Sequence, residues 1–125
     1  MNNFMKILLV EPDEYYHSQF MTHISDLGEL VIASDFKTAR ELIPKINPDI
    51  LITELWLSDE PGYKLLEEIN GSTRPAMLIV IFSRIDHPED TEAALNFGAN
   101  GYFVKGKDTI NDIRSLLLTY KHDRI

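Results

Sequence analysis

Five short apolar runs recur along the chain, and each is followed by a segment with helical spacing. The runs are rich in branched residues and show no alternation of polar and apolar positions; they cover residues 7–10, 30–33, 50–53, 77–82 and 101–104. Continuous apolar runs of this length are typical of strands that are covered on both faces, as in a parallel sheet. The pattern therefore predicts five buried strands.

Between these runs, apolar residues return every three or four positions, which predicts five helices. We expect the first helix to end at Gly28, since glycine is favoured just after a helix. The second begins at Ser34 or Asp35 and ends near Pro44, which cannot donate a hydrogen bond inside a helix. The third closes around residues 70–71, the fourth runs from 87 to 98, and the fifth starts near 108.

The order of strand then helix, repeated five times, predicts an α/β fold with right-handed crossovers and helices on both faces of a parallel sheet. In such sheets, functional groups gather at the carboxyl ends of the strands. The polar residues at these ends are Glu11, Asp13, Glu54, Ser83 and Lys105. Any one of them alone has a simpler explanation, such as capping the next helix. Their shared edge is what indicates a functional cluster.

Length and charge narrow the class of protein. The chain has 125 residues, with 12 basic and 20 acidic side chains and a net charge of −8, and we expect residues 1–125 to form a single domain. The acidic balance argues against direct binding of nucleic acid. The absence of cysteine excludes a disulfide framework, a thiolate zinc site and a cysteine nucleophile. The apolar runs are too short to span a membrane, so a cytoplasmic protein is expected.

These motifs, in this order, resemble the receiver domain of bacterial response regulators, the chemotaxis-regulator-like family. Residues 10–13 fall at the family's acidic pair and residues 48–54 at its phosphoacceptor strand. Gly62 falls at a loop glycine, Ser83 at the hydroxyl residue and residues 98–105 at the last signature. The resemblance covers nearly the whole chain. It implies a flavodoxin-like (βα)5 doubly wound sheet with strand order 2-1-3-4-5, and a signalling role in a two-component or phosphorelay system rather than an enzyme.

Two substitutions fall on residues that carry the family's chemistry. Glu54 stands where the family has its phosphorylated aspartate, and Pro12 stands where it has a magnesium-binding aspartate. Mg²⁺ demands near-octahedral geometry at about 2.0–2.1 Å from hard oxygens, and proline offers no side-chain ligand. The remaining metal candidates are Glu11, Asp13, Glu54 and the backbone carbonyl of Trp56. We therefore expect no phosphoacceptor chemistry and no cofactor.

The family's switch residues are still present as Ser83, Tyr102 and Lys105. We expect Glu54 to reach Lys105 as a permanent ion pair, with Ser83 nearby. Two interpretations of this pair remain open. It holds the domain in one active-like state without phosphate, or it only neutralises a buried lysine.

The sequence thus predicts a pseudo-receiver that acts by phosphorylation-independent protein contacts. The resemblance implies a histidine kinase or a downstream effector as partner, or a homodimer, through the fourth helix, the fifth strand and the fifth helix. The alternative is a conventional Mg²⁺-dependent receiver phosphorylated by a histidine kinase. A flavodoxin-like nucleotide or flavin binder has little support, because no Gly-x-Gly-x-x-Gly or Walker-type loop occurs.

Overall fold

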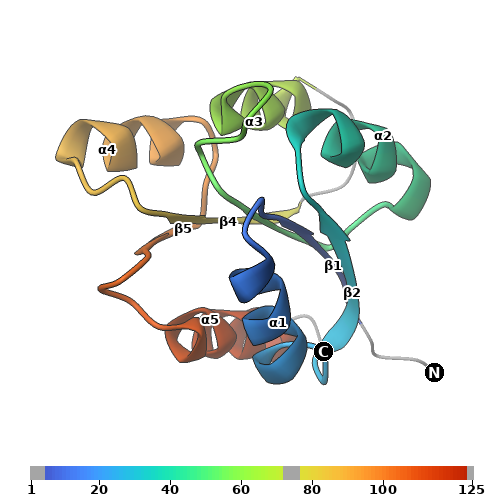
Figure 1. The fold of residues 1–125 in the computed structure, drawn as a ribbon. Helices are drawn as coiled ribbons and strands as arrows, with labels where there is room; N and C mark the ends of the chain where they lie inside the picture. Colours follow the sequence, from blue (N-terminus) through green and yellow to red (C-terminus); the bar gives the residue numbers. More distant parts are fainter. Residues whose placement is uncertain (1–4, 72–76, 124–125) are drawn as a thin grey trace.

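The central element of the fold is a parallel sheet (Figure 1). A computed structural model of the chain describes residues 5–71 and 77–123. The five strands are β1 (Met5–Val10), β2 (Gly28–Ala33), β3 (Ile50–Thr53), β4 (Leu78–Ser83) and β5 (Gly101–Val104). Their order across the sheet is β2-β1-β3-β4-β5, which confirms the predicted order.

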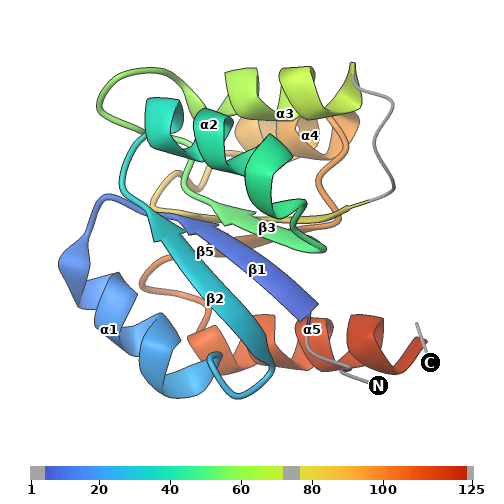
Figure 2. The same cartoon turned by 90° about the vertical axis from the view of Figure 1, so that its right-hand side faces the viewer.

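Helices cover both faces of this sheet (Figure 1 and Figure 2). On one face lie α1 (Glu14–His23) and α5 (Ile110–Asp123); on the other lie α2 (Phe36–Ile46), α3 (Gly62–Asn70) and α4 (Pro88–Asn96). Among the described residues, no helix has the length and apolar character needed to cross a membrane. The architecture is the predicted flavodoxin-like (βα)5 fold.

Two hydrophobic cores lie on opposite faces of the sheet. Alternate residues of a strand point to opposite faces, so Leu8 packs in the core beneath α2, α3 and α4, whereas Ile7 and Leu9 pack beneath α1 and α5. Every residue of β3 and β4 is buried. Burial on both sides explains why these strands read as continuous apolar runs.

The prediction that Gly28 ends the first helix was wrong. Helix α1 already ends at His23, and Gly28 is the first residue of β2, paired with Met5 of β1. A Cβ atom at Gly28 would lie 2.1 Å from the carbonyl oxygen of Met5. This glycine is therefore required by the close approach of two strands, not by a helix end.

The second helix ends two residues beyond Pro44, near the predicted end, but the expectation that Pro44 cannot lie inside the helix was wrong. Helix α2 continues through Pro44 to Ile46 and ends at Asn47, which adopts the left-handed conformation with φ 53°. Pro44 lies in the last turn, where its missing N–H removes one hydrogen bond, and the buried Ile43 holds this turn against the sheet. The other predicted helix ends lie within about two residues of the observed ones, the usual uncertainty of such boundaries.

Gly62, the first residue of α3, holds the chain close to the end of β3. A Cβ atom there would lie 2.5 Å from the carbonyl oxygen of Glu54 and 3.0 Å from Cα of Leu55, so backbone would have to move. We predict that Gly62→Ala lowers the free energy of unfolding by about 1–3 kcal/mol, measured by urea denaturation.

The matched control is Gly71→Ala at the end of α3. There the nearest atom lies 3.5 Å from the added Cβ and φ is −80°, which any residue adopts. This variant should leave stability unchanged or raise it by up to about 1 kcal/mol. Equal losses in the two variants would contradict the packing role assigned to Gly62.

Candidate functional site

The parallel sheet places three charged residues at one edge through its backbone hydrogen bonds. Glu11 donates its N–H to the carbonyl of Ala33 at 2.9 Å, and Glu54 donates to Val10 at 3.0 Å. Lys105 donates to Ser83, the last residue of β4, at 2.9 Å. Each of the three residues thus extends its own strand by one position alongside a neighbouring strand. Their side chains start from a fixed frame at the carboxyl end of the sheet.

The ammonium group of Lys105 lies between the carboxylates of Glu54 and Glu11. Its Nζ donates to Oε1 of Glu54 at 3.0 Å, which is the contact expected from the sequence. Oε1 of Glu11 lies 2.7 Å from the same nitrogen, in an ion pair that lacks hydrogen-bond alignment. The side chains of Lys105, Glu54 and Glu11 are only 4%, 8% and 1% exposed. We call these three residues the Glu–Lys–Glu cluster.

Backbone amides fix the second oxygen of each carboxylate. Oε2 of Glu54 accepts from the N–H groups of Leu55 at 2.6 Å and Trp56 at 3.3 Å. Oε2 of Glu11 accepts from the N–H of Asp13 at 3.0 Å. Both glutamates therefore hold one oxygen on the loop that follows their strand and turn the other toward Lys105.

Two aromatic rings complete the surroundings of Lys105. Its Nζ lies 4.6 Å from the ring centroid of Tyr16 on α1 and 5.5 Å from that of Phe82 on β4. These two rings meet edge to face, with centroids 5.1 Å apart. A cation is attracted to an aromatic ring at these distances. Tyr16 belongs to the helical spacing that follows the first apolar run, and no motif indicates its contact with a lysine so far along the chain.

The Glu–Lys–Glu cluster carries two negative charges against one positive charge. Burial raises the pKa of Glu11 above its ordinary value, and the nearby charge of Glu54 adds to the rise; Lys105 and the amide of Asp13 offset only part of it. In the cluster, burial therefore opposes the charged form of Glu11 while Lys105 favours it.

The other metal candidates do not converge on the cluster. Asp13 caps α1, accepting from the N–H of Tyr15 at 2.9 Å, and its side chain is 42% exposed. Pro12 is exposed and contributes no side-chain oxygen, and Trp56, which is 77% exposed, meets the cluster through its backbone N–H, which donates to Oε2 of Glu54. In the part of the chain that the structure describes, no three His, Asp or Glu side chains are placed to hold a metal. As arranged, these residues do not fit the octahedral oxygen set of Mg²⁺, because both glutamates face an ammonium group.

Ser83 and Tyr102 both bind Ile85, in the loop that follows β4. Oγ of the fully buried Ser83 accepts from the N–H of Ile85 at 3.2 Å, while the hydroxyl of Tyr102 donates to the carbonyl of Ile85 at 2.7 Å. Burial raises the pKa of Tyr102 to about 12. Ser83, Glu54 and Trp56 line one open cavity of about 460 Å³. Ser83 therefore lies near Glu54, as the sequence predicted.

The loop between β3 and α3 is tied to a neighbouring helix by Asp59. Its two carboxylate oxygens accept from the N–H groups of Phe36 and Lys37, each at 3.0 Å, at the start of α2. These hydrogen bonds lower the pKa of Asp59. The contact links this loop, which carries Glu54 at its start, to the adjacent layer of helices.

Comparison with known proteins matches the sequence to a known family. Residues 7–117 match the model of the response regulator receiver domain. A Leptolyngbya boryana protein, named as an uncharacterized 14.6 kDa protein in the sodA1 3' region, is 29% identical over 115 residues, which cover 88% of this chain and 86% of that protein. Regulator of RpoS from Escherichia coli is 29% identical over 113 residues; these cover 90% of this chain, which spans about a third of that relative (33%).

Solved structures share the fold. The N-terminal domain of an uncharacterized protein from Wolinella succinogenes superposes with a TM-score of 0.86, at 21% sequence identity over 96% of both chains. At that identity the likeness concerns the arrangement of strands and helices.

Replacing Lys105 tests whether the two buried carboxylates need its positive charge for stability. We predict that Lys105→Met, which strands two buried carboxylates, lowers the free energy of unfolding at pH 7 by about 3–5 kcal/mol. Lys107→Met is the matched control, because Lys107 pairs with Asp86 at 3.0 Å in the exposed loop two residues further on. This control should change stability by less than about 1 kcal/mol. If urea denaturation showed similar losses of stability in the two variants, Lys105 would not have the special burial and pairing assigned to it.

The raised pKa of Glu11 predicts a pH dependence. Because its pKa is higher in the folded than in the unfolded chain, the folded state binds the proton more tightly. The stabilisation that this proton gives the folded chain is fully present below the pKa of Glu11 in the unfolded chain. It is lost as pH rises through the pKa of Glu11 in the folded chain. Glu11→Gln keeps this position neutral at every pH. It should therefore be more stable than the parent chain at pH 7, and the difference should shrink toward pH 4.

Thermal or urea denaturation across this pH range measures the difference. Glu29→Gln, at an exposed position on β2, is the control and should match the parent chain throughout. A Glu11→Gln variant that is less stable than the parent chain at pH 7 would show that the attraction to Lys105 outweighs the cost of burying Glu11.

Proposed function

Because the chain belongs to the response regulator receiver domain family, we propose that it is a pseudo-receiver, which signals through protein contacts without being phosphorylated. The observation that carries this proposal is the state of Glu54, which stands at the family's phosphoacceptor position. Its Oε1 is held by Lys105 and its Oε2 by two backbone amides. Neither oxygen is free to attack a phosphoryl donor.

Charge supports the same conclusion. Phosphoryl transfer depends on positioning and on neutralising the charge of the transferred group. Here Pro12 replaces a metal ligand and Asp13 caps a helix, while Glu11 and Glu54 leave one net negative charge next to Lys105. Glutamate also moves the attacking oxygen by one methylene group. A displacement on the order of 1 Å can cost about a hundredfold in rate.

The Glu–Lys–Glu cluster takes over the role that phosphate has in the family. A phosphoryl group would present negative oxygens to the lysine and the hydroxyl residue; here the carboxylate of Glu54 binds Lys105 permanently. A buried ion pair broken on one side is strongly destabilising, so the cluster favours a single arrangement of the strand ends. We assign this arrangement to the signalling state of the domain.

The contact surface in this proposal is formed by α4, β5 and α5. β5 is an edge strand of the sheet, and α4 and α5 flank it (Figure 1). Two of the large exposed hydrophobic residues lie on these helices, namely Leu95 on α4 at 49% and Leu118 on α5 at 43% exposure. Exposed apolar side chains on adjacent elements are typical of protein contact sites. The partner in this proposal is a histidine kinase or a downstream effector.

The direct test is a phosphorylation assay. The purified chain is incubated with acetyl phosphate and Mg²⁺, and intact-protein mass spectrometry measures uptake of a phosphoryl group. We expect none, because the oxygens of Glu54 are engaged and the metal set is incomplete. The double variant Glu54→Asp, Pro12→Asp restores both family residues and should take up one phosphoryl group.

The two single variants separate the effect of the altered phosphoacceptor, Glu54, from the effect of the missing metal ligand at Pro12. Glu54→Asp alone keeps Pro12, and Pro12→Asp alone keeps Glu54, so each should be labelled more slowly than the double variant. Stoichiometric labelling of Glu54 in the parent chain would overturn the proposal in favour of a conventional Mg²⁺-dependent receiver.

A further inference from the structure

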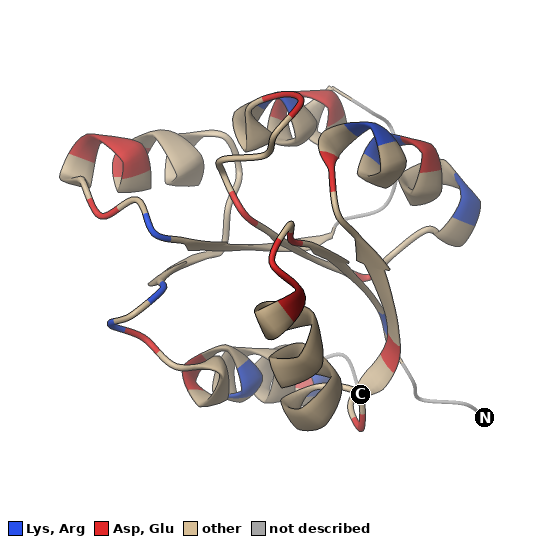
Figure 3. Cartoon of the chain, in the orientation of Figure 1, with Lys and Arg blue, Asp and Glu red and all other residues tan. Residues whose placement is uncertain are grey.

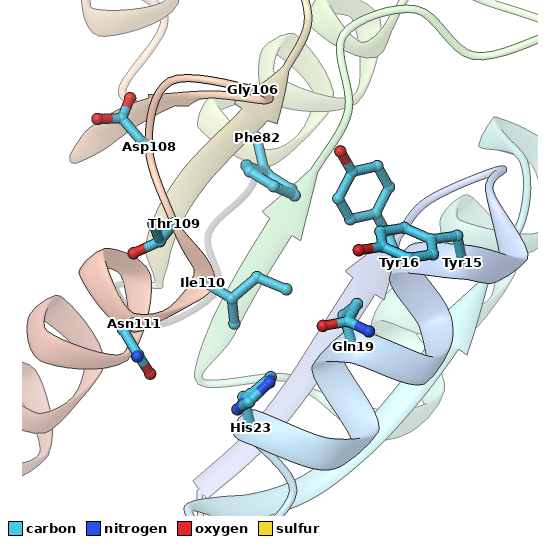
Figure 4. Close-up of a pocket in the computed structure, with 10 residues that line it drawn as sticks. All are labelled: Tyr15, Tyr16, Gln19, His23, Phe82, Gly106, Asp108, Thr109, Ile110 and Asn111. Atoms are coloured by element: carbon cyan, nitrogen blue, oxygen red, sulfur yellow. The ribbon is translucent and has the colours of Figure 1, made fainter.

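A second pocket opens on the other face of the sheet, between α1 and α5 (Figure 4). Its volume is about 250 Å³, just under the range of about 300–1,000 Å³ typical of sites for drug-sized ligands. An occupant must therefore be small. The walls come from α1, from the end of β4 and from the start of α5, and include Tyr16, Gln19, His23, Phe82, Ile110 and Asn111.

The pocket combines an apolar floor with polar groups that have no partner. Phe82 and Ile110 form the floor between the two helices (Figure 4). Within the described ranges 5–71 and 77–123, the side chains of Gln19, His23 and Asn111 make no hydrogen bond or ion pair to the protein; Gln19 is half-buried, while His23 and Asn111 are exposed at the rim. Both amides offer a donor and an acceptor, from opposite helices. An aromatic floor flanked by amide side chains is suited to a planar ring that carries hydrogen-bonding groups.

The charge of the lining disfavours an anionic ligand. Asp108 lines the pocket, and no lysine or arginine does. Arg114 on α5 is engaged by the carboxylate of Asp26 at 2.7 and 2.8 Å and by the carbonyl of His23. Acidic residues also outnumber basic ones over the chain as a whole (Figure 3). A phosphate or carboxylate would meet repulsion without a counter-charge, so the lining favours an uncharged molecule.

Two residues of the pocket also touch the Glu–Lys–Glu cluster. Tyr16 and Phe82 line the pocket, and their rings are the same two that lie against the ammonium of Lys105 at 4.6 and 5.5 Å. A ring bound in the pocket would contact these side chains directly. Displacing either ring changes the surroundings of Lys105, and through it those of Glu54 and its loop.

From this juxtaposition we infer that the pocket between α1 and α5 binds a small, uncharged, planar heteroaromatic molecule, and that binding is coupled to the Glu–Lys–Glu cluster through Tyr16 and Phe82. The coupling rests on the proposed function. A receiver that is not phosphorylated would use the bound small molecule, instead of phosphate, as its input signal. The binding site itself does not depend on that function.

Isothermal titration calorimetry with adenine and with nicotinamide tests the site, using the parent chain. We expect at least one of these two probes to bind and adenosine monophosphate to bind more weakly than adenine. The double variant Gln19→Ala, Asn111→Ala should weaken binding about tenfold or more, because two hydrogen-bonding groups are lost. Ser18→Ala, at an exposed position on α1 beside Gln19, is the matched control and should bind as the parent chain does.

The fluorescence of Trp56, the single tryptophan, measures the coupling, since the backbone N–H of Trp56 donates to the carboxylate of Glu54. Saturating probe should change this fluorescence in the parent chain. In Tyr16→Leu, provided that its melting temperature shows a folded chain, the fluorescence change should be smaller than in the parent chain when both are compared at full occupancy, which calorimetry on the variant establishes. A probe that binds the parent chain without any change in Trp56 would overturn the coupling.

Four other outcomes would overturn the proposed binding site. These are no binding of either probe, binding that the double variant leaves intact, tighter binding of adenosine monophosphate than of adenine, or binding of choline in place of both probes. None of them bears on the phosphorylation assay, which tests the proposed function separately.

Discussion

A buried lysine must be neutralised, and this requirement organises the carboxyl edge of the sheet. The ammonium of Lys105 is almost fully enclosed, which is costly unless opposite charge lies within contact distance. Glu54 and Glu11 supply that charge from two different strands. Because each glutamate also binds the backbone of its own loop, the lysine connects the loops that follow β1 and β3 to the end of β5.

The connection extends into both layers of helices. The loop after β3 is bound to the start of α2 through Asp59, and Lys105 is bounded by Tyr16 of α1. In a receiver, these loops are the parts that respond to phosphate. In this chain their resting contacts already satisfy the lysine, so an added phosphoryl group would have to compete with an ion pair that is in place. Under the proposed function, this geometry accounts for a glutamate and a proline at positions that phosphorylation would require.

Most of the fold could be predicted from the sequence, because continuous apolar runs reveal strands that are buried on both faces. The contact between Glu54 and Lys105 could also be predicted, since both residues follow strands and carry opposite charge. The role of Gly28 could not, because it depends on the distance between two strands. The continuation of α2 through Pro44 depends on the packing of its last turn. The contact of Glu11 and Tyr16 with Lys105 depends on how far one long side chain reaches across the sheet edge, which no spacing along the chain records.

The central claim is that the Glu–Lys–Glu cluster already occupies the place of phosphate and holds the site in one state. Amide NMR spectra of the uniformly ¹⁵N-labelled chain, recorded before and after addition of Mg²⁺ and beryllium fluoride, test it most directly, because beryllium fluoride mimics a phosphoryl group on a carboxylate. We expect the resonances of Glu54, Ser83, Tyr102 and Lys105 to stay in place. Saturable shifts at these four residues would contradict the account.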